Sequence, residues 1–127
     1  MTKEPGSKVP FVAIDHFQLA MPAGAESKAR EFFCNLPGMT EIAKPPALAK
    51  RGGCWFSSGK IQIHLGVQKD FRPATKAHPA LVCRDYHQLL TALRTAGVAV
   101  LEDSEIPGVS RCYISDPFGN RIELIAR

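Results

Sequence analysis

The sequence has no long apolar run, no Cys-x-x-Cys pair and no block of like charge. No stretch approaches the roughly 18 apolar residues that a transmembrane helix needs. The four cysteines, Cys34, Cys54, Cys83 and Cys112, are widely spaced, which argues against a zinc ribbon or a thioredoxin-type motif. The 16 Lys and Arg residues are scattered, so the net charge of +4 does not indicate nucleic-acid binding.

These absences favour a cytoplasmic single-domain protein that does not associate with membranes. Residues 1–10 lack an apolar signal region and predict a flexible tail, and residues 11–127 predict one domain. A hydrophobic content of 45% is enough for a real core. The cysteines are expected to be reduced and to pack structurally. The small positive charge favours an anionic small molecule as the partner.

From Phe11 onward the chain reads strand, helix, strand, hairpin, and then repeats that order. The first module, about residues 11–70, has these elements at 11–21, 22–39, 39–43 and 54–66, with a loop at 44–53 because paired prolines exclude regular structure. The second module, about residues 77–127, has them at 78–83, 84–97 (with Asp85 as N-cap), 98–103 and 110–126. The two halves meet near residue 72.

The strand "IQIHLG" places Ile61, Ile63 and Leu65 on one face, and Gln62 and His64 on the other. The repeat matches His64 with Glu123 in the last strand of the second module. His16 and His78 lie in the first strands of the two modules. Three imidazoles and one carboxylate would therefore converge if the modules pack with their strands in register.

This set suits a divalent transition metal, Zn, Ni, Co, Mn or Fe(II), which would act as a Lewis acid on a substrate with two neighbouring oxygens. Each histidine taken alone is better explained as a hydrogen-bonded core or cavity residue. Only their joint placement favours a metal site. By contrast, His87 lies off the apolar face of its predicted helix and is expected to be solvated.

The segments "IDHFQLAMP", "AREFFCNLPGMTEI", "HPALVCRDYHQLLTALRTAGVAV" and "CYISDPFGNRIELI" resemble the vicinal oxygen chelate superfamily over about residues 11–127. That superfamily includes glyoxalase I, extradiol dioxygenases, fosfomycin-resistance transferases and bleomycin-resistance proteins. The resemblance implies an α+β fold, in which two βαβββ modules form a half-open barrel-like sheet, and a homodimer. It implies metal ligands at His16, His78 and Glu123, with His64 at a position that varies among members.

The resemblance and the chain length favour a glyoxalase-like lyase or isomerase that works through metal-stabilised enolate chemistry. Glu123 or His64 is the candidate base, and Arg72 and Lys76 are candidate ligands for an anionic group of the substrate. Two alternatives stay open: an extradiol-type dioxygenase, and a metal-free binding protein of the bleomycin-resistance type. Whether the site lies within one chain or is shared across a dimer is also open.

Overall fold

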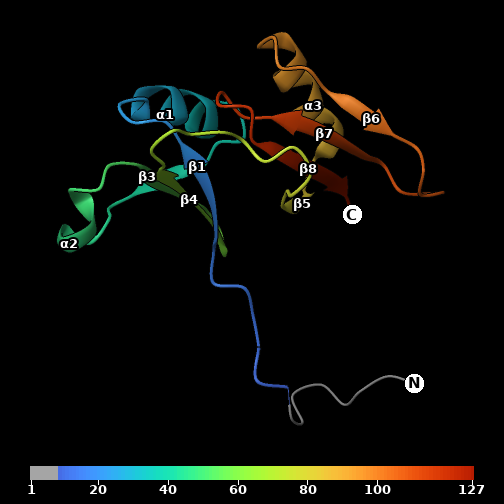
Figure 1. The fold of residues 1–127 in the computed structure, drawn as a ribbon. Helices are drawn as coiled ribbons and strands as arrows, with labels where there is room; N and C mark the ends of the chain where they lie inside the picture. The colour runs from blue at the N-terminus through green and yellow to red at the C-terminus, as the bar shows by residue number, and fades with distance from the viewer. Residues whose placement is uncertain (1–8) are drawn as a thin grey trace.

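Two four-stranded sheets lie side by side, each covered by a helix, in the computed structural model of the chain (Figure 1). The structure describes residues 9–127, so most of the predicted tail lies outside the described residues. The first module consists of β1 (Phe17–Met21), α1 (Glu26–Asn35), β2 (Thr40–Ile42), α2 (Pro46–Ala49), β3 (Cys54–Ser58) and β4 (Ile61–Val67). The second consists of β5 (Ala80–Cys83), α3 (Tyr86–Thr95), β6 (Leu101–Asp103), β7 (Arg111–Ser115) and β8 (Arg121–Ala126).

Both sheets have the same topology. The strand order is β1-β4-β3-β2 in the first sheet and β5-β8-β7-β6 in the second. In each sheet the module's first strand runs parallel to its last strand, and the other neighbours are antiparallel. The equivalent pairings place Gln18 opposite His64 and Ala80 opposite Glu123. This repeated order confirms the predicted α+β class and the two βαβββ modules.

Alternation along the strands separates a helix-covered face from a face that carries the candidate ligands. Ile63 and Leu65 are fully buried against the helices, as "IQIHLG" predicts, whereas Ile61 at the start of β4 is 47% exposed. Helix α1 contributes Phe33, whose ring stacks on Phe56 at a centroid distance of 5.3 Å. Because apolar side chains fill the space under the helices, the polar side chains of the same strands point to the opposite face.

The two modules share one apolar core instead of forming separate ones. Side chains from both modules line a small apolar void of about 40 Å³, among them Phe32 and Ile63 of the first and Leu93 and Ile122 of the second. The turn before β8 adds a polar link, since the Asn120 amide nitrogen donates to the Ala20 carbonyl at 2.8 Å. The modules are therefore held in a defined relation.

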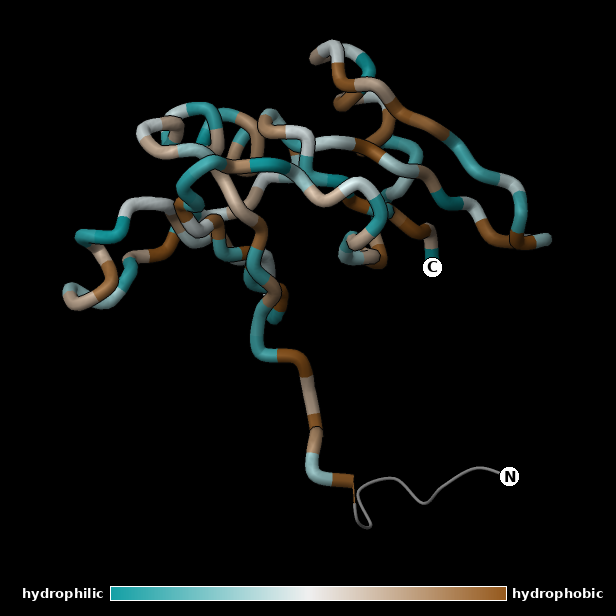
Figure 2. Tube along the Cα trace, viewed as in Figure 1, coloured by the Kyte–Doolittle hydropathy of each residue, from teal (hydrophilic) through white to brown (hydrophobic). Residues whose placement is uncertain are grey.

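The expected strand at 11–21 is shorter than predicted. Strand β1 begins only at Phe17, and the residues before it extend away from the sheet as an apolar arm (Figures 1 and 2). We call residues 9–15 the arm. Its Phe11, Val12 and Ile14 are 85%, 90% and 84% exposed. The alternation that suggested a strand is present, but the chain offers no neighbouring strand to pair with residues 11–16.

One further local expectation was wrong, and a second was confirmed in position but not in its side-chain contact. The loop expected at 44–53 contains the short helix α2, because Pro46 occupies its first turn, where a missing N–H costs nothing. Asp85 holds the N-cap position of α3, but its backbone is left-handed (φ 52°, ψ 48°) and its side chain makes no capping hydrogen bond. A capping side chain needs a β-region backbone at that position.

Two other observations concern the helices and the thiols. None of the helices in the described part of the chain is long and apolar enough to span a membrane. Each of the four cysteines is free, and Cys54 and Cys112 are buried at matching positions of β3 and β7. This placement agrees with the structural role expected for the thiols.

Candidate functional site

Three aromatic rings stack on the ligand-bearing face of the first sheet. His64 of β4 lies between Trp55, at a centroid distance of 3.8 Å and an interplanar angle of 5°, and His16, at 3.9 Å and 16°. The strand register explains the stack, because Trp55 is directly opposite His64 on β3 and His16 precedes the strand on its other side. The stack leaves His64 only 4% exposed.

Each histidine of this stack has one ring nitrogen engaged by an oxygen. The Nε2 of His64 lies 3.0 Å from the Gln62 amide oxygen, and the Nδ1 of His16 lies 2.8 Å from an Asp15 carboxylate oxygen. Because these oxygens only accept, the engaged nitrogens are the donors. Burial, followed by the proximity of His16, lowers the pKa of His64 and favours its neutral form.

The second sheet carries a separate pair, His78 and Glu123. The Nε2 of His78 lies 3.0 Å from one Glu123 carboxylate oxygen, while its Nδ1 donates to the Lys76 carbonyl at 2.7 Å. Arg111 donates to the other Glu123 oxygen at 3.1 Å. Burial raises the pKa of Glu123, but the hydrogen bonds from His78 and Arg111 outweigh it and hold this pKa below its usual range. Glu123 is therefore ionised at neutral pH.

Arg111 connects this pair to its surroundings. Its guanidinium also bonds Asp103 on β6 at 2.9 Å and the Tyr113 hydroxyl at 2.8 Å. Tyr113 lies directly opposite Glu123 in the ladder and meets the His78 ring edge-on at 5.3 Å. The carboxylate thus sits in a network that fixes its position and leaves neither oxygen without a donor.

The predicted site residues therefore come together as two pairs, His16 with His64 and His78 with Glu123. Within residues 9–127 of one chain, no group of three or more His, Cys, Asp or Glu side chains lies close enough to hold a metal ion. The donors nevertheless suit a metal by their chemistry. His16, His64 and His78 each have a ring nitrogen oriented by an oxygen acceptor, which is the usual surrounding of a metal-bound histidine. In His78 the second ring nitrogen contacts Glu123, the other proposed ligand of its pair.

The two predicted anion ligands differ in their placement. Arg72 lines a cavity of about 300 Å³ together with Gln18 and His78. Lys76 contributes its carbonyl to His78, and the residue is exposed to solvent. His87 is exposed on α3, as expected.

Two arginines of this region were missed from the sequence. Arg111 binds Glu123, and Arg121 lies with its guanidinium carbon 4.0 Å from the centroid of the Tyr113 ring. The period-two alternation of a strand was the available signal, because Arg121 is two residues before Glu123 and Arg111 two before Tyr113. All four therefore point to the same face.

The chain resembles known proteins when solved structures are compared. No protein-family model and no curated protein matches the chain. Its fold matches a glyoxalase family protein from Bacillus anthracis with 45% identity and a TM-score of 0.91, over 95% of this chain and 99% of that one. It also matches a glyoxalase/dioxygenase from Nostoc punctiforme (16% identity, TM-score 0.76, 99% and 98% covered) and a Streptomyces antibiotic binding protein (21%, 0.72, 93% and 98%).

Proposed function

The chain belongs to the glyoxalase family of the vicinal oxygen chelate superfamily, and from this premise we propose that it is a divalent-metal-dependent enzyme acting on a small oxygen-chelating substrate. The observation that carries the proposal is the donor set itself. His16 and His64 each have one ring nitrogen oriented by an oxygen, and His78 is oriented by the Lys76 carbonyl and contacts the ionised Glu123. Imidazole and carboxylate suit Zn, Ni, Co, Mn and Fe(II) alike. The free thiols fit the cytoplasmic location predicted from the sequence.

The favoured reaction is that of a lyase or isomerase that removes a proton beside a carbonyl group. A bound metal ion supplies Lewis acidity toward the substrate oxygens. Glu123 is the proposed base, because its carboxylate is ionised and is held in place by Arg111. His64 is the second candidate, because its ring is neutral and retains a lone pair. Arg72 is the proposed contact for an anionic part of the substrate, because it lines the same cavity as His78.

We propose that two copies of the chain complete each site. One chain presents the donors as two pairs on two different sheets, so His16 and His64 of one copy would meet His78 and Glu123 of a second. The exposed apolar arm supports a homodimer, since an arm with three large apolar side chains in water favours a protein surface that covers it.

A mixing experiment tests both the metal and the shared site. His16→Ala and Glu123→Ala should each lose bound metal, measured by elemental analysis of untagged protein after incubation with Zn, Ni, Co, Mn or Fe(II). When the two variants are unfolded and refolded together in equal amounts, half of the dimers are mixed and each has one intact site. Metal content should then return to about a quarter of the wild-type value.

The outcomes separate the alternatives. Mixtures that bind no more metal than their parents would place the site within one chain. If the wild-type protein binds none of the five metals, the metalloenzyme proposal is wrong. The control is His87→Ala, which should leave metal content unchanged because His87 lies on the exposed face of α3. Turnover of 2-oxoaldehyde–thiol adducts, as against catechols, then distinguishes a lyase from an extradiol dioxygenase.

The role of the arm has its own test. The triple substitution of Phe11, Val12 and Ile14 by serine should shift the protein from dimer to monomer, as measured by light scattering. The substitution removes the apolar surface that the partner is proposed to cover. The thermal stability of the monomer should not change, since the arm does not contribute to the core. Ile106→Ser, at an exposed loop residue, is the matched control. A triple variant that remains dimeric at low micromolar concentration would contradict this role.

A second candidate function, a metal-free binding protein, is favoured by one observation. Both carboxylate oxygens of Glu123 already have protein donors, so this half of the site is satisfied without a metal ion. Such a protein would bind a small molecule without turnover. It predicts stoichiometric ligand binding that is unaffected by chelators and unaffected by His16→Ala.

A further inference from the structure

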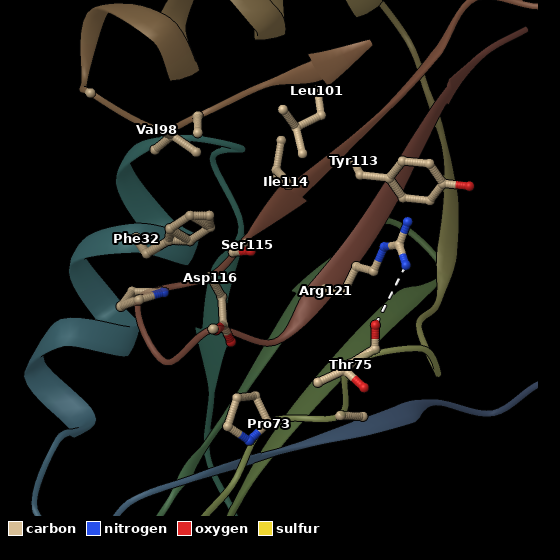
Figure 3. A pocket seen from close by; sticks show the side chains of 15 residues that line it. Phe32, Pro73, Thr75, Val98, Leu101, Tyr113, Ile114, Ser115, Asp116 and Arg121 are labelled. Carbon is tan, nitrogen blue, oxygen red and sulfur yellow. Dashed lines mark hydrogen bonds between the residues drawn. The ribbon is translucent and has the colours of Figure 1, made fainter. Parts of the chain in front are cut away.

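A cavity of about 600 Å³ is lined by Tyr113, the residue that lies opposite Glu123 in the ladder, and nothing in the proposed reaction requires this cavity (Figure 3). It is bounded by helix α1, strand β7, the segment leading into β6, and the connector at residues 73–75. Its walls are divided by chemistry. Phe32, Val98, Leu101 and Ile114 give one side an apolar surface, and Arg121 lies toward the other side next to Tyr113. A volume of this size suits a small organic ligand.

The guanidinium of Arg121 is oriented but poorly satisfied. It lies over the Tyr113 ring, with 4.0 Å from its central carbon to the ring centroid. In the described part of the chain, its hydrogen bonding amounts to one long contact, 3.5 Å from a terminal nitrogen to the Thr75 carbonyl. No acidic side chain of residues 9–127 forms an ion pair with it. Most of its five N–H donors are thus free for a ligand.

The acidic groups near the cavity do not pair with Arg121. Asp116 lines the cavity, but its carboxylate accepts hydrogen bonds from the Phe118 and Asn120 backbone amides and from the Asn120 side chain. Glu123 shares the strand face with Arg121, but it is held by His78 and Arg111. The cavity therefore presents one cation that has no ion pair within residues 9–127, opposite an apolar wall, while the Asp116 carboxylate is buried in its own turn.

We propose that this cavity binds a small organic acid with an apolar body, whose carboxylate pairs with Arg121 while the body packs against Phe32, Val98 and Ile114. A planar guanidinium matches a carboxylate with two parallel hydrogen bonds. Tyr113 contacts both Arg121 and His78, so the cavity and the proposed metal pair are neighbours. That this acid is the enzyme's substrate rests on the proposed function, whereas acid binding itself needs only the cavity.

The test compares 3-phenylpropionate with 3-phenylpropionamide, a neutral probe of the same shape, by isothermal titration of the full chain with and without added metal. The acid should bind at least about tenfold more tightly than the amide, because the amide cannot form the charge-assisted pair. Its affinity should fall as salt rises. Arg121→Gln should abolish the preference for the acid. Arg84→Gln, at an exposed arginine outside the cavity, should leave it unchanged.

A second measurement keeps the proposal testable if Arg121→Gln fails to fold. In the wild-type protein the Nε–H resonance of Arg121 should shift on addition of the acid and not on addition of the amide. Equal binding of the two probes, no binding of the acid, or an unmoved Arg121 resonance would each overturn the proposal. Metal content in the mixing experiment is independent of these outcomes, so failure of acid binding and failure of the proposed function remain distinguishable.

Discussion

Asn120 is the polar residue whose loss should reveal how firmly the two modules hold each other. It is 5% exposed, and its amide nitrogen donates to two acceptors, the Ala20 carbonyl and an Asp116 carboxylate oxygen, each at 2.8 Å. The first bond joins β1 of one module to the turn of the other, 100 residues along the chain. Substitution by alanine removes the donor and leaves both acceptors in place.

The loss of stability follows from the two acceptors that are left without a donor. A buried acceptor without a partner costs about 1–3 kcal/mol, and the Ala20 carbonyl is only partly buried, so Asn120→Ala should lose about 2–4 kcal/mol in free energy of unfolding. For a domain of this length, roughly 4 °C per kcal/mol gives a drop in melting temperature of about 8–16 °C. Asn120→Asp should lose at least as much, because its carboxylate would face that of Asp116.

Urea unfolding followed by circular dichroism, together with calorimetry, measures both quantities. Asn35→Ala is the matched control, since Asn35 is exposed near the end of α1 and has no side-chain hydrogen bond in the structure. It should change the free energy of unfolding by less than about 0.5 kcal/mol. A loss for Asn120→Ala no larger than that of the control would refute the view that this amide ties the modules together.

The fold was predictable because both modules signal each element locally. Apolar alternation gave the strands, the glycines after the helices marked their ends, and the match of "CWFSSGKIQIHL" to "CYISDPFGNRIELI" gave the repeat. The errors arose where tertiary structure decides. Residues 11–16 alternate like a strand, but a strand exists only where a neighbour pairs with it. Asp85 occupies the predicted N-cap position, but its backbone is left-handed and its side chain makes no capping hydrogen bond.

The sequence predicted which residue types lie on which face of each sheet. It did not predict the distances between the candidate ligands of the two sheets. The repeat correctly placed His64 and Glu123 on equivalent strands, facing away from the core. It did not reveal how far one sheet lies from the other, because that depends on the shared core beneath them. The repeat also did not reveal that the Trp55 ring stacks on His64 or that Arg111 donates a hydrogen bond to the Glu123 carboxylate. Both contacts run between neighbouring strands and depend on the strand register.

Two further predictions concern backbone and thiol. Gly53→Ala should lower the free energy of unfolding, measured with urea, by at least about 3 kcal/mol, because at φ +81° a Cβ would collide with the Leu65 carbonyl. The control Gly24→Ala, at φ +77° in open space, should lower it by only about 1 kcal/mol. Equal losses in the two variants would contradict this reasoning. Burial, with a smaller contribution from nearby Glu41, raises the pKa of Cys54 to about 11. Its thiol should therefore stay protonated at pH 8, and half-buried Cys34 should be alkylated first. The rate for Cys54 should rise about tenfold per pH unit up to that pKa. Mass spectrometry that finds both thiols alkylated equally fast at pH 8 would show that Cys54 is not shielded.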